Sequence, residues 1–347
     1  MTIEEAISRC RDMGGTDVHI IVNHSVHIRV MGDLKLQPDY MDEEEFREFI
    51  EKYDVPLYEG KATDASMVVS GITCRFNIYW ERGKRGMAIR LLSAEIPELE
   101  NLKLPAQVNK FLSVKNGMVL VTGTVGSGKT TTIAAMINEF NKVREGVILT
   151  VEDPIEFRHE SNKCLVIQRE VGKDVASYNA AIIDALRQDI NIVLVGELRE
   201  KDTIDAALTL AETGHLVFGT VHTKSLPEAI ERMAGTYPPE VRDSVVGRMA
   251  NVFRGGVHMR LVKKADGKRI AFPHVMYVDN KIRNAIEARK YSTVNDLMVS
   301  DPNCYSDIEA ACDIYKKGTP MDAIEPFLSP DDAQVVYDRL GLTRELV

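Results

Sequence analysis

The sequence predicts an α/β fold, in which a parallel sheet covered by helices on both faces follows a smaller α+β domain. From Gly117 onward, short apolar runs alternate with helical segments, as in chains whose parallel strands are joined by helices. The first hundred residues instead show apolar and polar residues in alternation, which is typical of half-buried strands. The length of 347 residues is enough for two domains with separate cores.

The composition is that of an ordinary soluble globular protein, with 44% apolar and 27% charged residues. The net charge of -9 argues against a nucleic-acid partner, because such binding needs clustered Lys and Arg. No apolar run approaches the roughly 20 residues that cross a bilayer, and the first residues lack the apolar core of a secretory signal. The five cysteines form no C-x-x-C pair, which favours reduced, structural thiols. We therefore expect a cytoplasmic protein that reaches a membrane only through partners.

The first hundred residues contain the signals of two hairpins and a helix. Residues 18–36 are strand-like and include a Gly32-Asp33 turn, whereas residues 42–53 have the charged, amphipathic pattern of a helix. The second hairpin is expected between residues 72–80 and 87–92, with one apolar face and one face that carries arginines. The predicted apolar face consists of Ile72, Cys74, Phe76, Ile78 and Trp80.

The later part of the chain contains four short apolar runs that we interpret as buried parallel strands. These runs are 118–123, 147–153, 191–197 and 216–223. We expect a linker with a helix that starts near Pro105, and after about Lys263 the pattern loosens into several helices. The expected divisions are an N-terminal domain (1–100), a linker (101–112), a nucleotide-binding core (113–300) and a helical C-terminal region (301–347).

The first of these runs leads into the sequence GTVGSGKT, which has the full G-x-x-x-x-G-K-[ST] pattern between a strand and a helix. Glycines let backbone N–H groups curl around phosphate oxygens, and the helix N-terminus adds partial positive charge. We expect Lys129 to reach the β- and γ-phosphates of a nucleotide and the Thr130 hydroxyl to be a ligand of Mg²⁺. The predicted nucleotide-binding residues are Gly123, Thr124, Val125, Gly126, Ser127, Gly128, Lys129, Thr130 and Thr131.

A carboxylate, Glu197, follows the apolar strand 192–195 directly. Ligands of open parallel sheets bind at the carboxyl ends of the strands, so we expect Glu197 to orient the water that attacks the γ-phosphate and to accept its proton. A salt bridge to Arg199 or a helix cap is the alternative interpretation.

Other polar residues follow neighbouring strands. No Asp stands at the end of the Glu197 strand, so Glu152 or Glu156 is expected to organise the water shell of the metal. His222 is expected to sense the γ-phosphate, whereas His215 follows a helix-ending glycine and is expected to satisfy a carbonyl.

Four segments, in this order, resemble the motifs of the secretion and type IV pilus motor ATPases. They are GTVGSGKTTT (phosphate loop), TVEDPIEF (Asp box), NIVLVGELRE (Walker B strand) and TGHLVFGTVHT (His box). The resemblance extends from about Asp17 to Leu297. It implies a PAS-like N-terminal domain, a RecA-like P-loop motor domain, a homohexameric ring, and hydrolysis of ATP with Mg²⁺.

Within this family the sequence is most similar to the pilus-retraction, or twitching-motility, branch. The N-terminal region is short, a four-cysteine zinc insertion is missing, and KIRNAIEARK resembles the AIRNLIRE helix of retraction motors, from which it departs at Lys281 and Ala285. The resemblance implies a motor that acts on an inner-membrane platform protein from the cytoplasmic face. The alternatives are a pilus-assembly or type II/type IV secretion ATPase, a regulatory nucleotide-binding module, and a nucleic-acid motor.

The resemblance also implies that arginines of the N-terminal domain reach a nucleotide bound at a subunit boundary. The matching residues are Arg75, Arg82 and Arg90, and the two on strands, Arg75 and Arg90, are favoured. A solvated strand face is the alternative interpretation.

Overall fold

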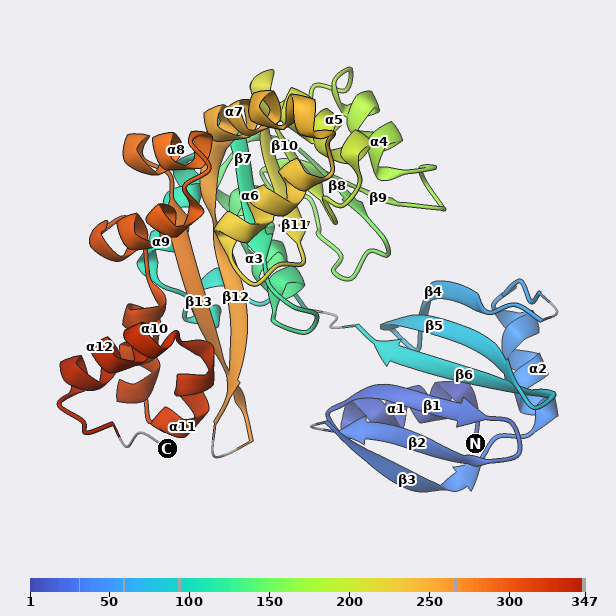
Figure 1. Cartoon of the computed structure of the whole chain (residues 1–347). Coiled ribbons are helices and arrows are strands. Elements are labelled where there is room, and N and C mark those ends of the chain that lie inside the picture. Colours follow the sequence, from blue (N-terminus) through green and yellow to red (C-terminus); the bar gives the residue numbers. More distant parts are fainter. Residues whose placement is uncertain (31, 59, 93–94, 265–266, 345–347) are drawn as a thin grey trace. The chain divides into compact units, whose positions relative to one another are not determined.

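The computed structural model describes residues 1–30, 32–58, 60–92, 95–264 and 267–344, and it divides the chain into two compact units (Figure 1). The first unit is Met1–Glu95, with which the short segment Glu156–Arg158 is grouped. The second is Ile96–Ile155 and His159–Val347. Each unit has hydrophobic core clusters made from its own residues.

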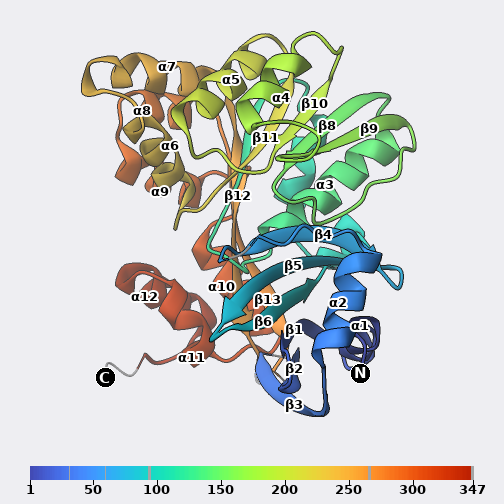
Figure 2. The ribbon, with the colours of Figure 1, turned by 90° about the vertical axis from the view of Figure 1, so that its right-hand side faces the viewer.

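The first unit is a six-stranded antiparallel sheet, in the order β3-β2-β1-β6-β5-β4, with two helices on one face (Figure 2). Its strands are β1 (Gly15–Ile21), β2 (Ser25–Val30), β3 (Asp33–Tyr40), β4 (Thr63–Val69), β5 (Ile72–Glu81) and β6 (Lys84–Leu91). Its helices are α1 (Ile3–Asp12) and α2 (Glu43–Lys52). Each helix begins with a capping box, Thr2 with Glu5 and Asp42 with Glu45, which satisfies free N–H groups of the first turn.

The predicted hairpin around Gly32-Asp33 is confirmed as β2–β3, but residues 18–36 hold an additional turn. This turn separates β1 from β2 at Asn23, whose φ of 60° is one that asparagine tolerates better than most residues. The second predicted hairpin is confirmed as β5–β6. Trp80 was wrongly placed on its apolar face: the residue is 43% exposed at the strand end, where the Arg85 guanidinium covers its ring.

The second unit contains a seven-stranded sheet in the order β13-β12-β7-β11-β10-β8-β9. Its strands are β7 (Gly117–Thr122), β8 (Gly146–Glu152), β9 (Cys164–Glu170), β10 (Ile192–Val195), β11 (Leu216–Val221), β12 (Phe253–Lys263) and β13 (Arg269–Tyr277). The four predicted strands are confirmed as β7, β8, β10 and β11, which are parallel neighbours. The sheet is not wholly parallel, because β13 pairs antiparallel with β12, and none of β9, β12 and β13 was expected.

Helices cover both faces of this sheet, which explains why its central strands are apolar throughout. α3 (Lys129–Val143) packs with Val119 and Val121 of β7, whereas Met118 and Leu120 belong to the core of the opposite face. That face is covered by α4 (Tyr178–Ala185), α5 (Lys201–Glu212), α6 (Leu226–Gly235) and α7 (Arg242–Val252). Among the described residues, no helix has the length and apolar character that a bilayer crossing requires.

The segment expected as a linker, residues 101–112, lies within the second unit. It overlaps two 3₁₀ helices, η1 (Leu99–Leu102) and η2 (Ala106–Ser113), rather than an α-helix after Pro105. Val108 and Phe111 are buried in the core on the α3 side of the sheet, and this burial makes the segment part of the unit.

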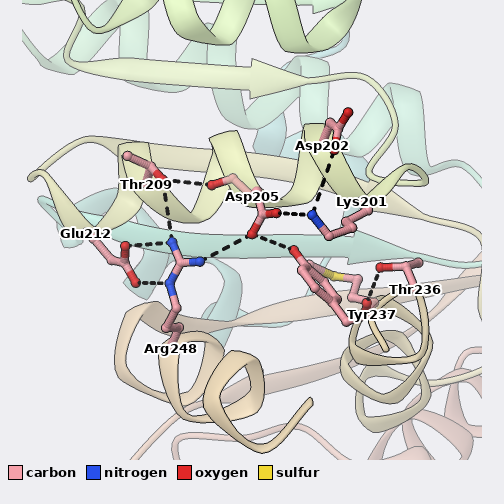
Figure 3. A network of polar contacts seen from close by, with 9 residues as sticks. Lys201, Asp202, Asp205, Thr209, Glu212, Thr236, Tyr237 and Arg248 are labelled. Atoms are coloured by element: carbon pink, nitrogen blue, oxygen red, sulfur yellow. Dashed lines mark hydrogen bonds and ion pairs between the residues drawn. The ribbon is translucent and has the colours of Figure 1, made fainter. Parts of the chain in front are cut away.

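A network of charged and polar groups joins α5 to α7 and to the loop after α6 (Figure 3). The Arg248 guanidinium contacts Asp205 at 3.3 Å and Glu212 at 2.8 Å, and the Tyr237 hydroxyl donates to Asp205 at 2.9 Å. Burial alone would raise the pKa of Asp205, but hydrogen bonds from Lys201 and Tyr237 outweigh it and lower that pKa. The network holds the helix that follows Glu197 in the chain against its neighbours.

The last described part of the chain is mainly helical (Figure 1, orange and red). The elements are α8 (Asn280–Glu287), α9 (Tyr291–Ser300), α10 (Asp307–Lys316), α11 (Met321–Ile324), η4 (Glu325–Phe327) and α12 (Pro330–Leu340). The first two helices, α8 and α9, belong to the core that α6 and α7 form, whereas the helices from α10 onward pack on the β12–β13 hairpin. Asp307, at the start of α10, accepts a hydrogen bond from Arg260 of β12, and the Nδ1 atom of His274 of β13 lies 3.3 Å from the same carboxylate. This cluster ties the C-terminal region to the sheet.

We predict that Asp307→Asn lowers the free energy of unfolding by about 2 kcal/mol at pH 7, because it removes the charge that Arg260 and His274 face. Burial opposes ionisation, but His274 and Arg260 hold the pKa of Asp307 far below its ordinary value. The stabilisation is therefore complete above the ordinary carboxyl pKa near 4 and is lost as the pH falls through the lowered folded value. Urea denaturation measures the free energy of unfolding, and the difference between the wild type and Asp307→Asn should be smaller at pH 3 than at pH 7. The exposed Asp331→Asn is the control, and equal stability of the two variants at pH 7 would contradict the assignment.

All five cysteines are buried and free, in agreement with structural thiols. Burial raises the pKa of Cys10 to about 11 and that of Cys74 to about 12, so both remain protonated.

Candidate nucleotide-binding and catalytic site

The loop between β7 and α3 has the backbone shape that phosphate binding requires. Gly123, Gly126 and Gly128 have φ values of 141°, 75° and 92°, which residues with a side chain rarely adopt. A Cβ at Gly123 would lie 2.3 Å from the carbonyl oxygen of Met259, so only glycine fits there. Gly128 precedes α3, and no side chain among the described residues caps the helix. The N–H groups of its first turn are therefore available to an anion.

Lys129 is buried in the loop, where its ammonium group is held by backbone carbonyls. Its Nζ atom donates to the carbonyl oxygens of Gly123 and Thr124, each at 2.8 Å. The Nδ1 atom of His222, at the end of β11, lies 3.3 Å from the same nitrogen. Burial and Lys129 lower the pKa of His222, against the opposing effect of Glu197, so the imidazole is neutral at pH 7. The structure thus brings His222 next to Lys129.

The predicted carboxylates stand at the ends of adjacent strands. β8 and β10 are paired in register, Val151 with Val195, so Glu152 and Glu197 follow at the same edge of the sheet. Glu152 is buried and accepts a hydrogen bond from the Thr150 hydroxyl at 2.7 Å. Glu197 is half-buried and close enough to His222 to act on its pKa. The edge therefore carries a cation, a neutral imidazole and two carboxylates.

Tyr178, the first residue of α4, belongs to this edge although no sequence motif pointed to it. A Cβ at Gly196 would lie 3.0 Å from the phenol oxygen, so this glycine leaves room for the ring. Burial, together with Asp153, Glu197 and Glu152, raises the pKa of Tyr178, and the phenol remains protonated. Tyr178 thus places a protonated phenol close enough to these carboxylates for them to act on its pKa.

Four other candidate residues are not on the sheet of the second unit. Arg75, Arg82 and Arg90 belong to the first unit, and Glu156 follows β8 in the short segment 156–158. His215 lies just after α5, and its Nδ1 atom is 3.1 Å from the carbonyl oxygen of Leu210 in the last turn of that helix, as expected.

The three arginines differ in their surroundings. Arg75 and Arg90 face each other across β5 and β6, and Arg90 donates to Asp17 of β1 at 2.8 Å. Arg82 is 91% exposed in the turn and lies 3.4 Å from Glu81.

The residues of the loop fit a nucleotide phosphate with Mg²⁺. The buried hydroxyl of Ser127 has no hydrogen-bond partner among the described residues, and Thr130 lies in the first turn of α3. Within the described chain no three His, Cys, Asp or Glu side chains are gathered to hold a metal by themselves. Mg²⁺ commonly takes one or two protein ligands together with substrate phosphates, and the Thr130 hydroxyl at the start of α3 suits that mode.

Comparison with known proteins shows that the chain is similar to ATPases of secretion and pilus systems. Residues 84–264 match the family described as Type II/IV secretion system protein. The chain is 36% identical to the type IV pilus retraction ATPase PilT of Pseudomonas aeruginosa, over 85% of this chain and 89% of that protein. It is 39% identical to a twitching motility protein of Neisseria gonorrhoeae, over 65% of this chain and 61% of that one.

Among solved structures, the chain is similar to the pilus retraction motor PilT with bound ADP. The TM-score is 0.83 and the identity 33%, with 97% of each chain covered. The ATPase DotB of Legionella pneumophila has the same fold, with a TM-score of 0.76 at 22% identity, over 98% of this chain and 96% of that one.

Proposed function

The chain belongs to the type II/IV secretion system protein family and is an ATPase of its pilus-retraction branch, and from this premise we propose that it works as a homohexameric, Mg²⁺-dependent motor that withdraws type IV pili. The similarity over nearly the whole of PilT, both in sequence and in structure, carries this proposal. The motor would act at the cytoplasmic face of the inner membrane on a pilus platform protein. A native mass of six chains is the expected result of light scattering with nucleotide.

The proposed roles follow from the contacts at the sheet edge. Lys129 would exchange its carbonyl partners for the β- and γ-phosphates of ATP. Glu197 would orient the attacking water and accept its proton as the bond to the γ-phosphorus forms and ADP leaves. His222, beside Lys129, would respond to the presence of the γ-phosphate.

Magnesium, when bound, neutralises charge on the β- and γ-phosphate oxygens. We propose Thr130 as its ligand in the loop and Glu152 as the carboxylate that orders its water shell. Glu152 is preferred to Glu156 because it is buried at the end of β8, next to the strand that leads to Glu197.

We predict that chelation with EDTA stops ATP turnover and that added Mg²⁺ restores it. Thr130→Val and Glu152→Gln should each raise the Mg²⁺ concentration at half-maximal turnover by about 10- to 100-fold, the usual cost of a lost metal contact. Glu156→Gln is the matched control and should leave this concentration unchanged. A Mg²⁺ titration of steady-state ATPase activity measures this, and a shift with Glu156→Gln alone would reverse the assignment of the two carboxylates.

A further inference from the structure

A buried polar pair lies at the base of the phosphate loop. Thr122 ends β7, directly before Gly123, and its hydroxyl oxygen lies 3.0 Å from the Nδ1 atom of His258 on β12. Both residues are buried, with 0% and 2% of their surfaces exposed. The other residues of β7 from Met118 to Val121 are apolar, so polarity begins in this strand only where the loop departs. Burying a hydroxyl and an imidazole costs free energy unless the two groups form a hydrogen bond.

β12 also packs closely against Gly123, the first residue of the loop. The carbonyl oxygen of Met259, the neighbour of His258, lies 2.3 Å from the position of a Cβ at Gly123. Gly123 in turn supplies one of the carbonyl oxygens that hold the Lys129 ammonium. A shift of Thr122 therefore acts directly on the carbonyl that orients Lys129.

His258 is itself held by the hairpin and by the C-terminal region. It pairs with His274 across β12 and β13, and Asp307 lies 3.3 Å from the Nδ1 atom of His274. Burial, with Arg260, His274 and Lys129, lowers the pKa of His258 to about 3, although Asp307 opposes this. The imidazole is thus neutral, and its bond to the Thr122 hydroxyl joins two uncharged groups.

We propose that His258 is a positioning residue for the phosphate loop, which acts through its hydrogen bond to Thr122. The proposal rests on the proposed function, because it takes the loop to bind ATP. His258 is not proposed to touch the nucleotide. It fixes the residue from which the loop starts, and so the distance between the Gly123 carbonyl and the first turn of α3.

The test compares ATP affinity in variants that break or keep this hydrogen bond. Thr122→Val and His258→Leu should each weaken ATP binding about tenfold, the equivalent of one buried hydrogen bond. The double variant should have the same ATP affinity as the single variant that binds ATP less tightly, because both changes remove the same interaction. Thr122→Ser and His258→Asn, which keep a hydroxyl and an acceptor near Nδ1, should stay within about threefold of the wild type. Titration with a fluorescent ATP analogue gives the affinities, and thermal unfolding without nucleotide shows which variants are folded.

A purely structural role gives a different result. If the melting temperature falls while ATP affinity is unchanged, or if the two single effects add in the double variant, the proposal is wrong. Should His258→Leu not fold, the comparison of His258→Asn with His258→Gln decides, because the longer amide keeps the polarity but moves it away from Nδ1. In that case the glutamine variant alone should lose affinity, and equal affinities overturn the proposal. A wild-type protein that does not bind ATP would refute the proposed function itself.

Discussion

Glu197→Gln is expected to reduce the kcat for ATP hydrolysis by about 10²–10⁴-fold, the usual contribution of a positioned general base. Glutamine has nearly the shape of glutamate but cannot accept the proton of the attacking water. Glu197 is half-buried after β10, where His222 and Lys129 line the same edge of the sheet. ATP affinity should stay within about threefold of the wild type, because the change removes an interaction made only in the transition state.

The control for this variant is Glu200→Gln. Glu200 is exposed at the start of α5, three residues from Glu197 in the sequence, and among the described residues its side chain makes no capping hydrogen bond. Its replacement should change neither kcat nor affinity. Full turnover by Glu197→Gln, with ATP still bound, would show that another group activates the water.

Arg75→Ala is expected to lower kcat by about 10³-fold, the lower end of what an arginine contributes when it reaches the γ-phosphate from a neighbouring subunit. Arg75 is preferred over Arg90, because Asp17 neutralises part of the Arg90 charge. It is preferred over Arg82, because a side chain in an exposed turn loses more conformational entropy when it is positioned. Arg47→Ala, which removes an exposed arginine of α2 in the same unit, is the control and should keep full activity.

A mixing experiment tests whether Arg75 acts across a subunit boundary. Arg75→Ala and Lys129→Ala rings should each be nearly inactive. When their subunits exchange, some interfaces combine an intact phosphate loop with an intact Arg75, and activity should recover. If the mixture is as inactive as its parents although mixed rings form, Arg75 does not act in trans.

The predictable part of the site is formed by residues whose roles follow from their immediate neighbours in the sequence. The glycine pattern around Lys129 needs a strand before it and a helix after it, and β7 and α3 supply them. Carboxylates or histidines directly after apolar runs share one edge because parallel strands end together, which is why Glu152, Glu197 and His222 were found.

The missed features depend on contacts between distant segments. Tyr178 looks like any apolar residue of a helix, and only the packing of α4 brings its phenol to Gly196. The pair of Thr122 and His258 is separated by 136 positions, and nothing in the sequence indicates that β12 lies next to β7. β13 was missed because its residues alternate less clearly, since the C-terminal helices bury part of its outer face.

If this motor withdraws pili, cells that lack its gene should differ from the parent in the number of surface pili, and counting these pili is the decisive experiment. Imaging should compare the deletion strain with strains complemented by the wild type, by Glu197→Gln and by Glu200→Gln. We predict excess surface pili and lost twitching in the deletion and Glu197→Gln strains, with normal pili in the other two. Bald deletion cells would contradict the claim and indicate an assembly motor, and an unchanged pilus number would contradict it in favour of secretion.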